Sequence, residues 1–267
     1  MPVTMAMTKI WDGYLAGDDL RRLETHGERA EDWLYLSILA MARHDVSAAS
    51  HYAAQAARRA PDDLLATSAS RYLGAVAGQG RDAIYTDPEG FRAFARGGGN
   101  RELYRRLSRR LREHYRELTP VSLLDVGVGD GMALLPALTD DVGSVDLLEP
   151  SRSLLEYTMA QLDGRQGVRA LPSTLQQLAT GQQGWSPQPH WSLAQATFSL
   201  HNVSTPDRRM ALSWLAHHCD RLAIAEFDIA ASSTPDPSWF SLVAERYRRG
   251  LAEYDGDGGV VSQAFLM

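Results

Sequence analysis

The pattern of apolar and polar positions changes near residue 115. Before that point, apolar residues recur at three- and four-residue spacing, which is typical of amphipathic helices. From Val121 onward, short apolar runs alternate with helical patterns, and five of these runs predict strands: VSLLDVGV, SVDLLEP, VRALPS, HWSLAQATFSLHN and RLAIAEFDI. Strands that alternate with helices of this size indicate a parallel, doubly wound sheet. We therefore predict an α/β fold with a mainly parallel, Rossmann-like sheet and an N-terminal all-helical cap.

We divide the chain into a helical domain over residues 1–80, a helical lid or linker over 81–119, and a sheet domain over 120–267. The first boundary follows AVAGQGR, whose two glycines near a helix end mark a joint. Within the helical domain, one tetratricopeptide-like spacing is formed by Trp33, Leu36, Ala40, Ala49, Ala53, Ala56 and Pro61. Three or more such units are needed for a binding solenoid, so we expect a packed cap.

The lid is predicted from helix start and stop signals. Pro88 follows Asp87 at a helix start, where its missing N–H is harmless. Gly97 to Gly99 end that helix, and Asn100 can cap the next one, which carries Tyr104 on its apolar face. After the first strand, GMALLPALTDD predicts a further helix that Pro136 bends or turns.

A glycine-rich turn between the first strand and the segment after it predicts a ligand site. Gly127 and Gly129 let the backbone turn sharply and approach a ligand closely. Asp125 before the turn and Asp130 within it oppose a phosphate, and Asp125 favours a cationic or hydrogen-bond-donating ligand. Glu149 ends the second strand, where a carboxylate can accept both hydroxyls of a ribose. A ribose, no phosphate and a positive centre together indicate S-adenosylmethionine.

With these residues, the region from about 85 to 229 resembles class I S-adenosylmethionine-dependent methyltransferases. LLDVGVGDG is similar to the family's first motif and VDLLEPS to its second, while ALPSTLQQL, ATFSLHN and RLAIAEFD follow in the family's order. The resemblance implies that the methionine part is lined by Asp125, Gly127 and Gly129, and that Glu149 holds the ribose. It also implies contacts of the cofactor with Pro150, Ser173, Thr174, Gln195 and Thr197, and a lid from Asn100 and Tyr104.

One departure from the family concerns the end of the sheet. After Asp228 the sequence offers one helical pattern and then DGDGGVVSQAFLM, so two strands that usually close the seven-stranded sheet are missing. The chain is then either a truncated piece or has a differently covered sheet edge. A bare edge favours association, and we keep a homodimer as a possible state.

The candidates for catalysis are His201, which follows the fourth strand, and Tyr85 in the lid region. Tyr104 and Glu226 are further candidates near strand ends. His201 either takes a proton from the acceptor or only shapes the pocket. His217, His218 and Cys219 are consecutive on a helix and cannot converge on one ion, so we predict no metal.

The composition of the chain limits the classes of partner that we expect it to bind. The net charge of −6 gives no pull toward nucleic acid or an anionic membrane, and no apolar run is long enough to cross a bilayer. Cys219 is the single cysteine, which agrees with a reducing cytoplasm. We therefore expect a cytoplasmic methyltransferase that acts on a small molecule in specialised biosynthesis.

Two alternatives stay open from the sequence. An enzyme with the same cofactor could cyclise it or transfer its aminocarboxypropyl group, with release of methylthioadenosine. A protein of another class would combine helical repeats for interaction with an inactive cofactor fold. The intact Asp125, glycines and Glu149 argue against the latter.

Overall fold

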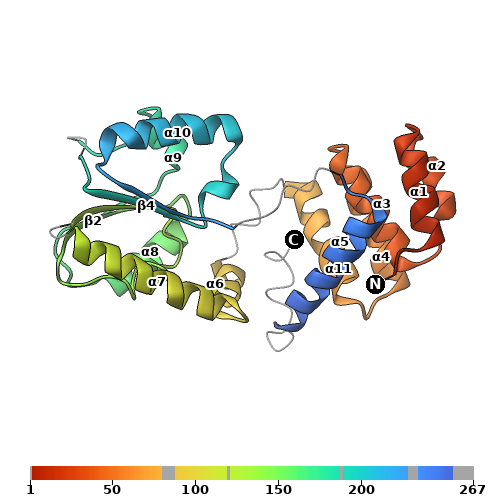
Figure 1. Ribbon diagram of the computed structural model, residues 1–267, viewed down its shortest axis with the longest axis horizontal. Coiled ribbons are helices and arrows are strands. Elements are labelled where there is room, and N and C mark those ends of the chain that lie inside the picture. Colours follow the sequence, from red (N-terminus) through yellow and green to blue (C-terminus); the bar gives the residue numbers. More distant parts are fainter. Residues whose placement is uncertain (1, 80–87, 119–120, 187–188, 228–233, 255–267) are drawn as a thin grey trace. The chain divides into compact units, whose positions relative to one another are not determined.

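The computed structural model describes residues 2–79, 88–118, 121–186, 189–227 and 234–254, which belong to two compact units (Figure 1). The helical unit comprises Met1–Gly99 together with Ala230–Met267. The sheet unit comprises Asn100–Ile229. The first and last segments of the chain therefore belong to the helical unit, and the segment between them forms the sheet unit.

The helical unit is built around one apolar core. Its helices are α1 (Met5–Leu15), α2 (Leu20–Leu23), the 3₁₀ turn η1 (Glu24–His26), α3 (Ala30–Ala42), α4 (Val46–Arg59), α5 (Leu64–Gln79), α6 (Pro88–Arg96) and α11 (Pro237–Ala252). Small side chains let α3 and α4 pack closely, because Ala40, Ala49 and Ala53 are all fully buried. The predicted helical hairpin is present, but a tetratricopeptide repeat is not confirmed.

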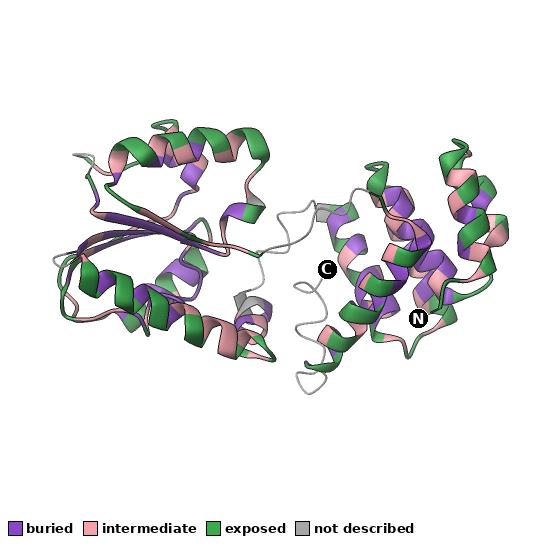
Figure 2. Ribbon diagram, viewed as in Figure 1, coloured by how far each residue is buried: buried purple, intermediate pink, exposed green. Residues whose placement is uncertain are grey.

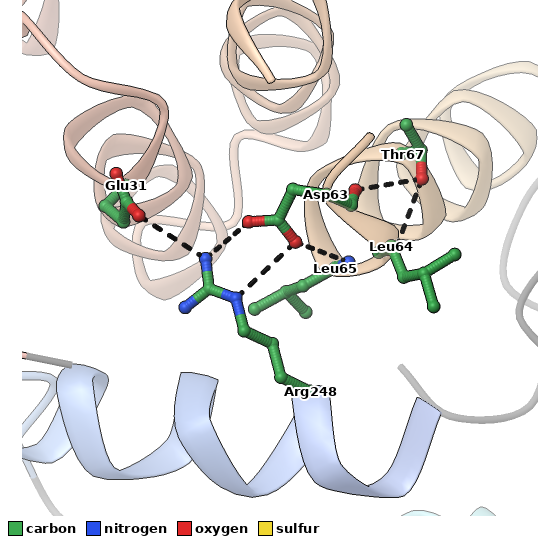
Figure 3. A network of polar contacts seen from close by, with 6 residues as sticks. All are labelled: Glu31, Asp63, Leu64, Leu65, Thr67 and Arg248. Carbon is green, nitrogen blue, oxygen red and sulfur yellow. Dashed lines mark hydrogen bonds and ion pairs between the residues drawn. The ribbon is translucent and has the colours of Figure 1, made fainter. Parts of the chain in front are cut away.

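The last helix belongs to the helical unit, unlike the sequence-based division, which placed it with the sheet. Phe240 and Leu251 of α11 are buried in the helical core. Arg248 donates to Asp63, with 2.5 Å between Nη2 and Oδ2, and its Nη2 lies 3.6 Å from Glu31 (Figure 3). One arginine therefore joins α11 to α5 and α3.

The sheet unit contains five parallel strands in the order β3-β2-β1-β4-β5. They are β1 (Val121–Val126), β2 (Val142–Leu148), β3 (Val168–Leu171), β4 (Leu193–Thr197) and β5 (Leu222–Ala225). Helices α7 (Asn100–Glu117) and α8 (Arg152–Gln161) cover one face, and α9 (Leu175–Ala179) and α10 (Thr205–His218) cover the other (Figure 1). This confirms the predicted α/β fold class.

Alternation along the strands explains the two layers. Leu123 of β1 packs in the cluster with α7 and α8, whereas its neighbour Leu124 packs with α9 and α10. Both are fully buried, as expected for a parallel strand covered on both faces. Figure 2 shows the central strands as buried between helices whose outward faces are exposed.

The predicted helix after the glycine turn is wrong, since residues 127–141 form successive turns without an α-helix. Pro136 has no N–H to donate and disfavours a helical residue before it. Side chains of α7 contact carbonyls of this segment instead. Ser108 Oγ lies 3.3 Å from the carbonyl of Met132, which Pro136 leaves without a helical donor, and 2.9 Å from that of Ala133, and Arg112 donates to that of Pro136. No helix N-terminus therefore follows the glycine turn.

Strand β5 lies at one end of the sheet order, and the described part of the chain contains no strand after it. Ile224 of β5 is 48% exposed. Among the described residues, none of the helices is long and apolar enough to cross a membrane.

Candidate functional site

The glycine turn lies at the carboxyl end of β1 and needs glycine for steric reasons. Gly127, Gly129 and Gly131 have φ angles of +71°, +57° and +78°, which side chains other than glycine rarely adopt. A Cβ on Gly127 would come within 2.5 Å of Cβ of Ser199. The Gly127 N–H donates to the carbonyl of Leu148 at 2.7 Å. The turn therefore packs closely between the carboxyl ends of β2 and β4.

Glu149 holds the glycine turn from the end of β2. Its Oε2 accepts from the backbone N–H of Gly129 at 3.0 Å, and its Oε1 accepts from the N–H of Ser151 at 2.8 Å. Burial raises the pKa of Glu149, although both hydrogen bonds act to lower it. Each carboxylate oxygen can accept a further hydrogen bond, so the group is able to receive two ribose hydroxyls as well.

Asp125, near the end of β1, is a buried acid with one unsatisfied oxygen. Tyr115 donates to Oε1 of Gln195 at 2.6 Å, and Gln195 donates in turn from Nε2 to Oδ2 of Asp125 at 2.7 Å. Oδ1 of Asp125 is buried with no hydrogen-bond partner among the described residues. The pKa of Asp125 is raised to about 7, mainly by burial; the Gln195 bond acts to lower the pKa and the charge of Glu149 to raise it. A bound cation would favour the ionised form and satisfy the free oxygen.

Another buried acid of the sheet, Asp146 on β2, differs because its carboxylate is satisfied. Arg169 donates to it from two nitrogens, at 2.7 and 2.5 Å, and Trp191 donates from Nε1 at 2.7 Å. Such a paired carboxylate serves the packing of β2 against β3 and Trp191. Of these two buried strand residues, only Asp125 has a carboxylate oxygen without a hydrogen-bond donor among the described residues.

The exit of β4 joins α7 to the glycine turn. Phe198 follows β4 with a φ of +53°, and its N–H donates to the carbonyl of Ala225 at 2.8 Å. The ring of Tyr104 lies edge-on to Phe198, with 5.6 Å between centroids. Ser199 Oγ donates to the carbonyl of Val126 at 2.7 Å. Tyr104 is thus placed beside the β4 exit, and Asn100 begins the same helix four residues earlier.

Ser173 and Thr174, which the resemblance places beside the cofactor, have hydrogen-bond partners close by in the chain. Thr174 caps α9, because its hydroxyl accepts from the N–H of Gln177 at 3.2 Å and Gln177 Oε1 accepts from the N–H of Thr174 at 3.1 Å. Ser173 Oγ also donates to Gln177 Oε1, at 3.1 Å. Pro150 is exposed after Glu149. Their contacts with a cofactor stay a prediction.

The other predicted residues divide into two groups. Gln195 and Thr197 lie on β4 with 0% and 9% of their surface exposed, beside Asp125 and at the strand's end. Tyr85 lies outside the described residues, so its catalytic role stays a prediction.

His201 follows β4 in a short 3₁₀ turn, η3 (Leu200–Asn202), and contacts an acid that follows β5. Its Nδ1 lies 2.9 Å from Oε2 of Glu226. Oε1 of Glu226 accepts from the N–H of Leu200 at 2.7 Å. Glu226 was a candidate base in the sequence, but its pairing with His201 required two neighbouring strands and could not be foreseen from either segment.

The histidines and cysteine at the end of α10 bond to their own helix. His217 and His218 contact the carbonyls of Ser213 and Trp214 through Nδ1, at 2.7 and 2.8 Å, and Cys219 contacts that of Leu215. Within the described ranges, no three His, Cys, Asp or Glu side chains gather so that they could hold a metal ion.

The site therefore combines a buried, incompletely paired acid, a turn of three left-handed glycines and a second buried acid. The residues fit a ligand with a cationic group and vicinal hydroxyls, because carboxylates accept hydrogen bonds from both. They fit a phosphate poorly, since Asp125, Asp130 and Glu149 are at most 6% exposed and would repel it.

No protein-family model and no curated protein matches the chain, whereas solved structures do. The magnesium protoporphyrin IX methyltransferase ChlM from Synechocystis PCC 6803, with bound S-adenosylmethionine, is 17% identical at a TM-score of 0.41, over 54% of this chain and 72% of that one. CalS10 from Micromonospora echinaspora, an amino pentose methyltransferase, is 20% identical at a TM-score of 0.38, over 51% of this chain and 54% of that one. DesVI from Streptomyces venezuelae is 19% identical at 0.38, over 49% and 54%. The chain thus spans about half the length of the last two proteins. Over part of its length it resembles these solved methyltransferase structures.

Proposed function

We propose that this chain is an S-adenosylmethionine-dependent methyltransferase that acts on a small molecule. The observation that carries the proposal is the pair of buried acids around the glycine turn, Asp125 with its unsatisfied oxygen and Glu149 on the Gly129 N–H. A cationic nucleoside without phosphate would supply a partner for the free oxygen of Asp125 and further donors for Glu149. The structural neighbours ChlM and CalS10 are both methyltransferases.

Each residue of the site then has a defined task. Asp125 would hold the ammonium group of the methionine part, and Gln195 and Tyr115 keep its carboxylate in place. Glu149 would accept the ribose hydroxyls while it clamps the glycine turn. S-adenosylmethionine supplies a methyl group already activated by its sulfonium centre, so alignment and exclusion of water are the protein's main contribution.

The proposal is tested by calorimetric titration of the full chain with S-adenosylmethionine and, for comparison, with NAD. We expect binding of the first and at least tenfold weaker binding of the second, because the buried acids oppose its pyrophosphate. Glu149→Gln should weaken S-adenosylmethionine binding at least tenfold, about 1.4 kcal/mol, since the neutral amide accepts the ribose hydroxyls less well. Glu156→Gln, on the exposed face of α8, makes the same charge change and should leave binding unchanged.

The reaction type is tested by mass spectrometry of the cofactor after turnover. S-adenosylhomocysteine is expected if a methyl group is transferred. Methylthioadenosine would instead support cyclisation or aminocarboxypropyl transfer. Absence of any S-adenosylmethionine binding would refute the proposal and favour an interaction protein with an inactive cofactor fold.

A further inference from the structure

Beside the glycine turn, His201 and Glu226 form a pair in which the carboxylate is fixed on both oxygens. Oε1 of Glu226 accepts from the backbone N–H of Leu200 at 2.7 Å and from that of His201 at 3.3 Å, while Oε2 contacts Nδ1 of His201 at 2.9 Å. A carboxylate only accepts, so the ring proton of the neutral histidine is placed on Nδ1. The lone pair is then on Nε2. The His201 side chain is 45% exposed, which leaves this nitrogen accessible.

A row of aromatic rings leads up to the same histidine. Phe198 stacks on Phe227 with 4.6 Å between centroids and 20° between planes, and Tyr104 lies edge-on to Phe198. The ring of His201 lies 5.8 Å from that of Phe227. Phe227 is 45% exposed, although it is a large apolar side chain. An exposed aromatic surface therefore lies next to a nitrogen able to accept a proton.

The backbone that holds this row is conformationally unusual. Phe198 has a positive φ of +53°, which is uncommon for a bulky side chain. The hydrogen bond from its N–H to the carbonyl of Ala225 keeps the segment against β5. Residues in such conformations often occur at ligand sites, where the surrounding structure maintains them.

The pair and the aromatic row are also close to the site proposed for the cofactor. Ser199, between Phe198 and His201, lies so near Gly127 that a Cβ there would come within 2.5 Å of it. Ser199 is also bonded to the carbonyl of Val126 at the end of β1. The fourth and fifth strands thus deliver the pair to the carboxyl edge of the sheet, where ligands bind in this fold.

We propose that the methyl acceptor is a hydroxyl group on a flat aromatic ring, a phenol, which rests on Phe227 and gives its proton to Nε2 of His201. Glu226 is a positioning residue that fixes the tautomer and orientation of His201. The inference rests on the proposed function and adds the substrate class. A flat ring is favoured over an aliphatic alcohol because aromatic rings stack on one another.

The reaction balances without a further reactant. The phenol O–H bond breaks and its proton moves to His201 Nε2, while the oxygen forms a bond to the methyl carbon. The carbon–sulfur bond breaks with its electron pair left on sulfur, which gives an aryl methyl ether and neutral S-adenosylhomocysteine. His201 then returns its proton to water, and Glu226 stabilises the transient imidazolium.

The first test is spectroscopic and does not depend on turnover. Long-range ¹H–¹⁵N spectra of the full chain at pH 8, assigned with His201→Asn, distinguish the two tautomers of His201. We expect Nδ1–H in the wild type and a shift toward Nε2–H in Glu226→Ala, whereas Glu226→Gln should retain Nδ1–H because its amide oxygen still accepts. A wild-type ring with its proton on Nε2 would overturn the assignment of His201 as proton acceptor.

The second test uses phenol, cyclohexanol and aniline as probes, titrated into the chain saturated with S-adenosylhomocysteine. Phenol should perturb the signals of His201 and Phe227 and bind at least tenfold more tightly than cyclohexanol. Phe227→Ala should remove that preference, while Ile224→Ala, exposed to a similar degree on β5, should preserve it. Equal binding of phenol and cyclohexanol would overturn the aromatic subsite.

Turnover then separates the acceptor classes. We expect methylation of phenol, with kcat reduced about 10²–10⁴-fold in His201→Asn and less in Glu226→Gln. Methylation of aniline but not phenol would overturn the hydroxyl assignment in favour of an amine. If S-adenosylhomocysteine does not bind, the proposed function fails; if it binds and phenol leaves the spectra unchanged, only the present inference fails.

Discussion

The substitution Asp125→Asn gives the sharpest test of the site, because it removes a buried charge while it keeps the shape of the side chain. Burial raises the pKa of Asp125 from 3.8 to about 7. A carboxyl with a raised pKa in the folded state binds its proton more tightly there than in the unfolded chain. Its contribution to stability is therefore fully present below about pH 3.8 and is lost as the pH rises to about 7. Asparagine avoids this loss, since it does not ionise.

The magnitude follows from the two pKa values. The interval between 3.8 and about 7, at about 1.4 kcal/mol per pH unit, gives about 4 kcal/mol of lost stability above pH 7. The stability already lost at pH 5 is smaller, about 1.5–2 kcal/mol by the same relation. One polar atom lacks a partner at this position in both proteins, so its cost of about 1–3 kcal/mol largely cancels in the comparison. The advantage of asparagine over aspartate should therefore grow by about 2–3 kcal/mol from pH 5 to pH 8.

The assay is urea unfolding of both proteins at pH 5, 6, 7 and 8, followed by circular dichroism, with the difference in free energy of unfolding taken at each pH. Contributions from the helical unit cancel in that difference. Asp140→Asn, on the exposed turn before β2, is the matched control and should change the free energy by less than about 0.5 kcal/mol at every pH. A difference for Asp125→Asn that does not vary with pH would refute the titration of this carboxyl near neutrality. Addition of S-adenosylhomocysteine should stabilise the wild type more than Asp125→Asn, because its ammonium group meets a charge only in the former.

Two further substitutions test the packing of each unit. Arg248→Met should lower the free energy of unfolding by about 1–3 kcal/mol in urea titrations at pH 7, because it leaves the carboxylates shown in Figure 3 without their cation. The control is Arg249→Met on the same helix, where the arginine is 69% exposed, and it should change the free energy of unfolding by less than about 0.5 kcal/mol. Equal effects of the two substitutions would contradict the role of Arg248. Gly127→Ala should destabilise the sheet unit by at least about 2 kcal/mol and abolish calorimetric binding of S-adenosylmethionine, because both φ and the contact with Ser199 oppose a Cβ. Gly164→Ala has a similar φ and no atom within 4 Å, so a loss as large as that of Gly127→Ala would show that strain alone is responsible.

The sequence by itself determined the features that depend on neighbours along the chain. The five strands follow from short apolar runs, and their parallel arrangement follows from the helices between them. The glycine turn could be located because three alternate glycines and Asp125 stand within seven residues. Their order along the chain already indicates a left-handed turn with acids beside it, which local conformational preference explains.

Local sequence patterns did not predict the structure where the same residues are compatible with more than one conformation or role. GMALLPALTDD has a helical apolar pattern, yet Pro136 disfavours the helix, and Ser108 and Arg112 of α7 supply donors for carbonyls of the segment. Thr174, predicted to contact the cofactor, also caps α9 through Gln177, and its contact with a cofactor stays a prediction. The choice between such outcomes depends on hydrogen-bond partners from elsewhere in the fold.

Only the tertiary structure decided the contacts between distant segments. The apolar stripe of α11 fits a sheet face or a helical core equally well, and Arg248 with Asp63, 185 residues away, joins it to the helices. His201 and Glu226 are 25 residues apart and meet because β4 and β5 are adjacent and in register. Asp125 is acidic in any sequence, but its pKa near 7 arises from burial between strands and α7. Periodicity records which face of an element is buried, whereas the partner of that face is set by packing of the whole chain.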